Sequence, residues 1–204
     1  MRILAVSDVV DPALQERFQP KRYRDVKLIL ACGDLAPEYL GALAHRVGAP
    51  LYYVMGNHDI RESDYPPPGC MDLNARVVRL QGLTLAGLEG SMWYNGGPHQ
   101  YEEKQMQKKA RELGGRIRRT RRPLDIVITH APPRGIHDGE DLCHQGFEAF
   151  RWLIRKFAPR FFLHGHIHRR FDTDAERVTE VDRTKVINAY GHHLLDIEDE
   201  KDSG

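Results

Sequence analysis

The sequence predicts an α/β layered fold with a mixed sheet system, and two observations support this fold class. Short apolar runs rich in β-branched residues recur along the chain, each with the length and uniformity of a strand buried on both faces. Segments with helical signals separate these runs in the first half of the chain, and further strand-like runs follow in the middle and at the end. Early alternation of strand and helix, with strands added later, is typical of layered α/β proteins.

The predicted strands, in chain order, are residues 3–6, 26–30, 51–54, 77–80, 83–88, 126–128 and 161–163. The stretch from 177 to 197 alternates apolar and polar residues, and we expect late strands or a hairpin there. The first predicted helix follows Asp11-Pro12, with an aspartate at the N-cap and a proline at the first helical position. Three more helices are expected after Pro37, over about 101–119, and over 146–157.

Length and composition indicate an ordinary globular protein. A chain of 204 residues fits one domain spanning residues 1–204. Hydrophobic residues make up 41% and charged residues 29%, which excludes a disordered chain, and the formal net charge of +1 does not indicate a nucleic-acid partner. No apolar run approaches the roughly 20 residues of a membrane helix, so we expect no membrane span.

The cysteines indicate a cellular compartment but no catalytic motif. Cys32, Cys70 and Cys143 are an odd number without paired spacing, which favours a reducing compartment, and we expect the cytoplasm. No cysteine has a partner histidine at the spacing of a catalytic motif, so structural roles are expected for Cys32 and Cys143.

Polar residues with metal-binding side chains follow five of the apolar runs. Ligands gather at the carboxyl ends of parallel strands, so these residues are expected to converge although the sequence scatters them. Imidazole and carboxylate together suit divalent ions such as Mn, Fe, Zn or Co, and a bridging aspartate can hold two ions. Taken singly, each is compatible with a helix cap or a turn, but their placement at successive strand ends favours a metal site. The segments are Ser7-Asp8, Gly33-Asp34, Gly56-Asn57-His58-Asp59, Thr129-His130 and His164-Gly165-His166-Ile167-His168.

This ordered set resembles the motifs of the calcineurin-like metallophosphoesterases, and the resemblance runs from Asp8 to His168. It implies a four-layer α/β/β/α sandwich, two mixed sheets flanked by helices, with a binuclear metal centre at the strand ends. By this resemblance, Asp34 bridges two metal ions, Asn57, His130 and His166 complete one site, and Asp8 and His168 serve the other. His58 would assist the leaving group or stabilise the phosphoryl charge, and Asp59 would orient His58.

One position departs from the family pattern. Family members usually begin with Asp-x-His, whereas the third position here is Val10. The site of Asp8 and His168 then has three protein ligands, with Asp34 as the third. We therefore expect a weaker or more exchangeable ion there, and an inactive site is the alternative. Asp11 is a candidate substitute, but its position before Pro12 favours helix capping.

The function implied by the resemblance is a metal-dependent phosphohydrolase in which water, activated by two divalent transition metal ions, attacks phosphorus. Mn is the favoured metal, with Fe, Zn, Ni and Co as alternatives, and phosphodiesters are favoured over phosphomonoesters. The alternative is a catalytically weak or inactive protein-interaction module, because a retromer subunit reuses this fold for protein binding. Only the Val10 position has lost its ligand, which favours catalysis. The sequence does not indicate an oligomeric state.

Two further features bear on the substrate. The segment from Lys104 to Arg122 holds nine Lys or Arg and one acid, Glu112. A solvated helix face followed by a basic loop is the simpler interpretation, while a phosphate-steering patch for a nucleotide, a nucleic acid or an anionic head group is the functional one. A structure-specific nuclease would rest on this segment alone. The glycine-rich loop around Tyr94 and the segment 137–146 are candidate walls of a substrate pocket.

Overall fold

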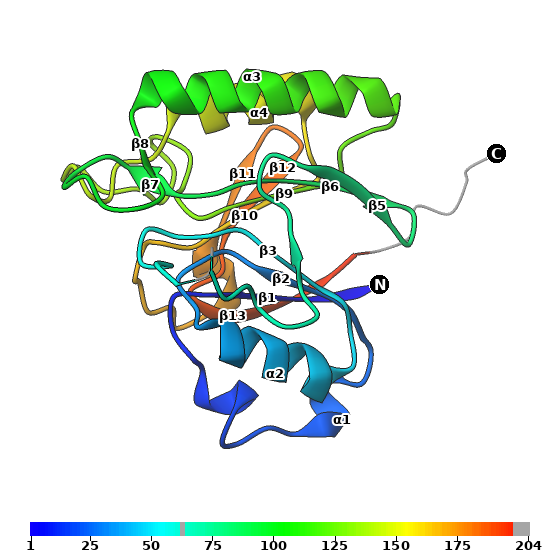
Figure 1. The fold of residues 1–204 in the computed structure, drawn as a ribbon. Helices are drawn as coiled ribbons and strands as arrows, with labels where there is room; N and C mark the ends of the chain where they lie inside the picture. The colour runs from blue at the N-terminus through cyan, green and yellow to red at the C-terminus, as the bar shows by residue number, and fades with distance from the viewer. Residues whose placement is uncertain (62–63, 198–204) are drawn as a thin grey trace.

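The structure is a computed structural model that describes residues 1–61 and 64–197, and it has two β-sheets stacked face to face between two layers of helices (Figure 1). The first sheet has the strand order β13-β1-β2-β3-β4. The strands β1 to β4 are parallel to one another. The edge strand β13 pairs antiparallel with β1, placing Leu194 opposite Leu4. Their bounds are β1 Arg2–Ser7, β2 Val26–Ala31, β3 Leu51–Tyr53, β4 Met71–Asp72 and β13 Gly191–Asp196.

The second sheet has the order β11-β12-β10-β9-β6-β5. Its four central strands are parallel, and the edge strands β11 and β5 are antiparallel to their neighbours. Two short strands, β7 (Ser91–Met92) and β8 (Gln100–Tyr101), pair separately. The bounds are β5 Val77–Leu80, β6 Leu83–Leu88, β9 Ile126–Thr129, β10 Phe161–His164, β11 Val178–Val181 and β12 Thr184–Asn188.

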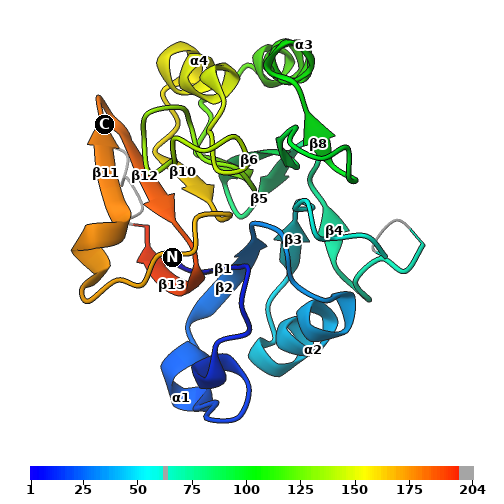
Figure 2. The same cartoon turned by 90° about the vertical axis from the view of Figure 1, so that its left-hand side faces the viewer.

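Helices cover the outer face of each sheet. The helices α1 (Pro20–Tyr23) and α2 (Pro37–Val47) lie against the first sheet, and α3 (Glu103–Thr120) and α4 (Glu148–Phe157) lie against the second (Figures 1 and 2). The amino ends of α3 and α4 are tied together, because the Glu103 carboxylate accepts hydrogen bonds from the backbone N–H groups of Glu148 and Ala149 at 3.0 and 2.9 Å. A carboxylate at a helix amino end satisfies free N–H groups and interacts favourably with the helix dipole.

Three apolar layers follow from this stacking. The middle layer lies between the sheets and includes Leu30, Ile128 and Leu163, while the outer layers lie under α3 and α4 and under α2. The central strands face an apolar layer on both sides, which explains why most of their residues are apolar. The predicted sandwich of two mixed sheets flanked by helices is confirmed.

The segment after Asp11-Pro12 was predicted as a helix and contains only a 3₁₀ turn, Pro12–Leu14, before α1 begins at Pro20. The Asp11 carboxylate does cap this turn, accepting from the N–H of Ala13 at 2.8 Å. Residues 15–17, which follow the turn, are exposed and carry no apolar face to bury, so the turn does not extend into a helix. Within residues 1–61 and 64–197, no helix has the length and apolar character needed to cross a bilayer.

Candidate metal centre

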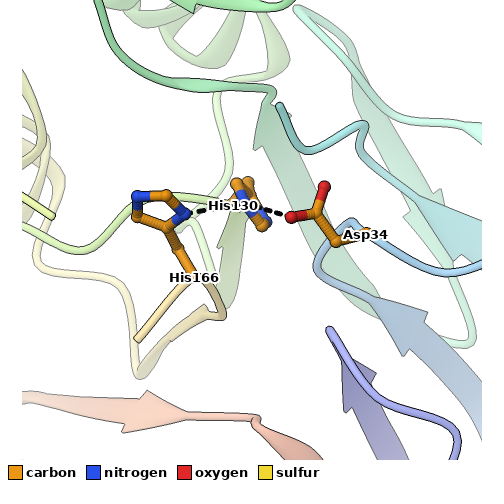
Figure 3. A group of neighbouring side chains, drawn as sticks. All are labelled: Asp34, His130 and His166. Atoms are coloured by element: carbon orange, nitrogen blue, oxygen red, sulfur yellow. Dashed lines mark hydrogen bonds and ion pairs between the residues drawn. The ribbon is translucent and has the colours of Figure 1, made fainter. Parts of the chain in front are cut away.

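Four of the predicted ligands come together where strands from both sheets end. The Nε2 atom of His130, after β9, lies 3.1 Å from Asn57 Oδ1 and 3.1 Å from His166 Nδ1. The same atom lies 3.2 Å from Asp34 Oδ2, and Figure 3 shows the Asp34 and His166 side chains approaching His130 from opposite sides. His130 is fully buried, and Asn57 and His166 are nearly so.

The hydrogen bonds behind the two imidazoles fix their tautomers. His130 Nδ1 lies 2.7 Å from the carbonyl oxygen of Cys32, and His166 Nε2 lies 2.7 Å from the carbonyl oxygen of Cys143. A carbonyl can only accept, so each of these nitrogens carries the hydrogen. In the neutral rings, the opposite nitrogens, His130 Nε2 and His166 Nδ1, therefore present lone pairs to the centre. Ligand histidines in proteins are typically oriented in this way.

The cluster is rich in electron pairs and attracts positive charge. Asp34 Oδ2 is buried without a hydrogen-bond donor, while Asp34 Oδ1 accepts from the N–H of His58 at 2.9 Å. Burial alone disfavours charge on His130, but the carboxylates of Asp34 and Asp8 outweigh it and raise the pKa of His130 to about 9. Burial likewise opposes ionisation of Asp34, yet His130 holds the pKa of Asp34 well below its ordinary value. These donors fit a divalent transition metal ion, which suits carboxylate, amide and imidazole ligands.

The backbone is strained at three of the candidate ligands. Asp8, Asp34 and His166 have φ angles of +67°, +58° and +68°, in the left-handed region that side chains other than glycine seldom adopt. Such residues cost about 1–3 kcal/mol each and cluster at functional sites, where the surrounding structure compensates. Two neighbouring glycines allow the close packing, since a Cβ on Gly56 would collide with the Asp34 carboxylate and one on Gly165 with Ser7.

Asp8 and His168 form an adjoining pair. The Asp8 carboxylate accepts from the backbone N–H of His166 at 3.0 and 3.1 Å and lies 3.4 Å from His168 Nε2. The His168 ring is exposed and stacks on Tyr190, with 5.1 Å between ring centroids. The Asp8 carboxylate is buried. The pair therefore offers one buried and one accessible candidate metal ligand beside the buried cluster.

Val10 lies against the helical layer of the first sheet. It packs on the apolar cluster under α2 and lines a pocket there with Ala36 and Tyr39. Asp11, the candidate substitute, is otherwise engaged, because one carboxylate oxygen caps the 3₁₀ turn and the other lies 2.7 Å from His192 Nδ1. The expected preference of Asp11 for capping is confirmed.

His58 and Asp59 occupy different environments. The residue His58 is exposed and lines a pocket of about 400 Å³ together with Asp34, Ala36 and Arg61. The Asp59 carboxylate is buried and accepts from the backbone N–H groups of Gly56 and Asp34 at 2.7 and 2.9 Å. Burial raises the pKa of Asp59 to about 7 despite these two donors. These hydrogen bonds support the loops that carry Asn57 and Asp34, a role that differs from the expected orientation of His58 by Asp59.

Several supporting residues were not among the predicted ligands. The Tyr94 hydroxyl accepts from Asn57 Nδ2 at 3.2 Å, which leaves Asn57 Oδ1 facing His130. His164 Nε2 lies 2.9 Å from His137 Nδ1, and His137 Nε2 lies 2.7 Å from the Thr179 hydroxyl. The backbone carbonyls of Cys32 and Cys143 are invisible to side-chain patterns. In the sequence, the glycine-rich loop around Tyr94, and the position of 137–146 between His130 and a predicted helix, were the only signals for these segments.

The part of the basic segment in which arginines are most frequent lies away from this centre. Arg118 and Arg119 end α3, and Arg121 and Arg122 lie in the loop that leads to β9. His130 follows the other end of β9, whose four residues span about 13 Å. The run of arginines is therefore at the opposite end of the strand, and a solvated helix face followed by a basic loop describes it.

Comparisons with known proteins agree on one family. A family model described as calcineurin-like phosphoesterase matches residues 1–170. The lariat debranching enzyme of Schizosaccharomyces pombe is 24% identical over 189 residues, a match that covers 76% of this chain and 40% of that enzyme. The chain thus spans about two fifths of the length of this relative.

Solved structures share the fold at low identity. The protein TT1561 of Thermus thermophilus superposes with a TM-score of 0.63 at 18% identity, covering 93% of this chain and 88% of that one. The calcineurin-like phosphoesterase YfkN of Bacillus subtilis gives 0.58 at 10% identity, covering 92% and 80%. Wild-type Vps29 of Entamoeba histolytica, solved with Zn²⁺, gives 0.51 at 11% identity, covering 98% and 88%.

Proposed function

Because the chain belongs to the calcineurin-like phosphoesterase family, we propose that it is a metal-dependent phosphohydrolase acting on phosphate esters, with phosphodiesters preferred. The observation that carries this proposal is the convergence of four candidate metal-ligand atoms on one point. Asp34 Oδ2, Asn57 Oδ1, His130 Nε2 and His166 Nδ1 face one another, and two backbone carbonyls fix the imidazole tautomers. Buried lone pairs that face one another are costly without a partner, and a bound cation would supply that partner.

In this proposal, Asn57, His130 and His166 hold one divalent ion, Asp8 and His168 hold a second, and Asp34 is shared. Bound ions would polarise the phosphate ester and supply a deprotonated water as the nucleophile. Mn is the favoured metal, and Fe, Zn, Ni and Co also suit these ligands. His168 is exposed and Val10 contributes no ligand, which supports the expectation that the ion held by Asp8 and His168 exchanges more readily.

The pocket beside His58 supports a position for the ester. It has a volume of about 400 Å³ and is lined by Asp34, His58 and Arg61, so a carboxylate of the centre and two basic side chains share it. The residue His58 is exposed, and its backbone N–H donates to Asp34 Oδ1. We assign His58 to the leaving oxygen or to the phosphoryl charge, and Asp59 to the support of the loop.

The family and this pocket support phosphate esters as the substrate class. A lariat debranching enzyme is among the relatives. The densest basic residues of this chain lie away from the centre, so the charge pattern gives little support to a nucleic-acid substrate. Cysteine usage keeps the cytoplasm as the predicted compartment.

The test is hydrolysis of a nitrophenyl phosphodiester and a nitrophenyl phosphomonoester with Mn, Ni, Co, Zn and Mg in turn. We expect turnover with at least one transition metal and faster turnover of the diester. His130→Ala should abolish turnover and His45→Ala, an exposed histidine on α2, should not. Absence of turnover with every metal, in protein that still binds metal, would favour the interaction module instead.

A further inference from the structure

The loop whose Cys143 carbonyl contacts the His166 ring also contains a second cluster of possible metal ligands. Unlike the candidate metal centre, this cluster includes a thiol. Asp141, Cys143 and His144 place one ligand atom each within 4.8 Å of one another. His144 Nδ1 lies 2.9 Å from both carboxylate oxygens of Asp141. In the described part of the chain, this cluster and the set of Asp34, His130 and His166 are the two groups of three such ligands.

We propose that Asp141, Cys143 and His144 form a zinc site, distinct from the candidate metal centre and closed by one water. A thiolate, an imidazole and a carboxylate are the three ligand types that zinc takes in proteins. In a tetrahedral zinc site the ligand atoms stand about 3.5 Å apart, so the three side chains need only small movements to reach it. Zinc entry releases the thiol proton of Cys143 and moves the imidazole hydrogen of His144 to Nε2.

Charge balance favours a divalent ion here. A thiolate and a carboxylate carry two negative charges, which a divalent cation neutralises, and a neutral imidazole adds none. Cys143 is a free thiol, in side-chain hydrogen-bond contact with Tyr94. The candidate metal centre, in contrast, has only oxygen and nitrogen donors.

The loop that carries this cluster is held in shape by a residue outside it. The Asp138 carboxylate accepts from the backbone N–H of Gly135 at 3.0 Å and of Gly146 at 3.1 Å, which joins the two ends of the loop. Arg134 Nη1 also donates to Asp138, at 2.8 Å. The three ligands therefore project from a closed turn, and little chain entropy is lost when an ion binds.

A zinc ion at this turn would act on the candidate metal centre through the backbone. The carbonyl of Cys143 accepts from His166 Nε2, and the rings of His144 and His166 are 5.4 Å apart. Fixing the turn fixes that carbonyl and with it the His166 ring. Asp141 is exposed and the His144 side chain is partly exposed, so zinc reaches this turn from solvent without passing through the buried centre.

The test uses cobalt as a spectroscopic substitute for zinc. Thiolate ligation of Co²⁺ produces a charge-transfer absorption band that oxygen and nitrogen ligands do not. We expect this band in the wild-type chain, its loss in Cys143→Ser and in His144→Ala, and its retention in the control Cys70→Ser, whose thiol lies outside the cluster. Added Zn²⁺ should displace Co²⁺ and remove the band.

A second measurement needs no variant. Zn²⁺ should slow alkylation of Cys143 in the wild-type chain while leaving alkylation of Cys70 unchanged, as read by mass spectrometry. A wild-type chain without the band, or a band that persists in Cys143→Ser, would overturn the proposal. Both readouts are independent of turnover, so they stand apart from the test of the proposed phosphohydrolase.

Discussion

Each of the two central imidazoles is held from behind by a backbone carbonyl. Cys32 supplies the carbonyl for His130, and Cys143 supplies it for His166. Any residue type carries a carbonyl, so the identity of these two residues is not needed for that contact. At the scale of single residues, the centre therefore requires particular residue types at its ligands and at its close-packed glycines. The positions that contribute only a backbone carbonyl can be occupied by any residue type.

His58 offers a test of roles at this scale. His58→Ala keeps the backbone N–H that donates to Asp34, so metal content should not change. If the imidazole assists the leaving group, kcat should fall by roughly 10²–10⁴-fold, the usual effect of general acid–base help. Kinetics together with elemental analysis check this, and His45→Ala is the control. A parallel loss of metal and rate would show that His58 serves to support the ligands.

Val10 allows a second test. A histidine at this position would restore the usual Asp-x-His start, but the Val10 side chain packs under α2. We therefore expect Val10→His to leave both metal affinities unchanged in calorimetric titrations and to destabilise the fold by about 1–3 kcal/mol, because a polar ring replaces an apolar contact. Tighter binding of one ion would mean that the loop after β1 turns to present residue 10 to the centre.

At the scale of elements, a buried polar network joins β6, β8 and α3 next to the centre. Glu89 follows β6, and its side chain is 9% exposed. It accepts from the Tyr101 hydroxyl at 2.5 Å and from Lys109 Nζ at 3.3 Å, and His99 Nδ1 lies 3.5 Å away. Lys109, one of the cations of the basic segment, thus serves inside the fold.

This network predicts how stability depends on pH. Burial opposes the charge on Glu89, but His99, Tyr101 and Lys109 outweigh it and lower the pKa from 4.5 to about 2. The hydrogen bond to Glu89 raises the pKa of His99 above 6.5. Glu89 therefore stabilises the fold above about pH 4.5 and loses this contribution as pH falls towards 2, while His99 contributes below pH 6.5 and loses its contribution as pH rises.

Both contributions are present between about pH 4.5 and 6.5. In that window, Glu89→Gln should lower the free energy of unfolding by about 1–3 kcal/mol, the cost of leaving buried polar groups without their charged partner. The difference from wild type should shrink as pH falls towards 2, which denaturant titrations at several pH values would measure. Glu112→Gln, an exposed acid on α3, should have no effect, and an unchanged stability of Glu89→Gln would contradict the network.

At the scale of the whole molecule, the candidate centre joins the two sheets. Asp34 and Asn57 follow strands of the first sheet, and His130 and His166 follow strands of the second. An ion held by all four would bind the folded chain and not the unfolded one, because no unfolded chain brings these residues together. Metal binding should therefore stabilise the fold as a whole.

The expected effect can be measured by thermal unfolding. Metal at one hundred times its dissociation constant adds about 2.7 kcal/mol, which raises Tm by about 5–10 °C for a chain of this size. Asp34→Asn should remove most of the rise on adding Mn²⁺, and Asp25→Asn, an exposed surface aspartate, should leave it intact. A rise of equal size in Asp34→Asn would place the ion elsewhere.

Much of the fold was predictable from local patterns. The largely apolar strands were found because they lie between two apolar layers, and α2 was found from Pro37 at its start. The helix after Pro12 was predicted wrongly, because a good cap starts a turn but cannot extend it without an apolar face to bury. The single domain of residues 1–204 stays a prediction.

The sequence by itself determined which side chains stand at the strand ends, and hence the candidate ligands Asp8, Asp34, Asn57, His130, His166 and His168. A residue's type and its place in a strand are local properties, so a pattern can carry them. Only the tertiary structure decided that His130 Nε2 meets Asn57, Asp34 and His166, that carbonyls of Cys32 and Cys143 fix the two rings, and that the Val10 side chain lies under α2. The direction of a side chain and the partner behind it depend on how loops from two sheets pack, and no single segment of the sequence contains that information.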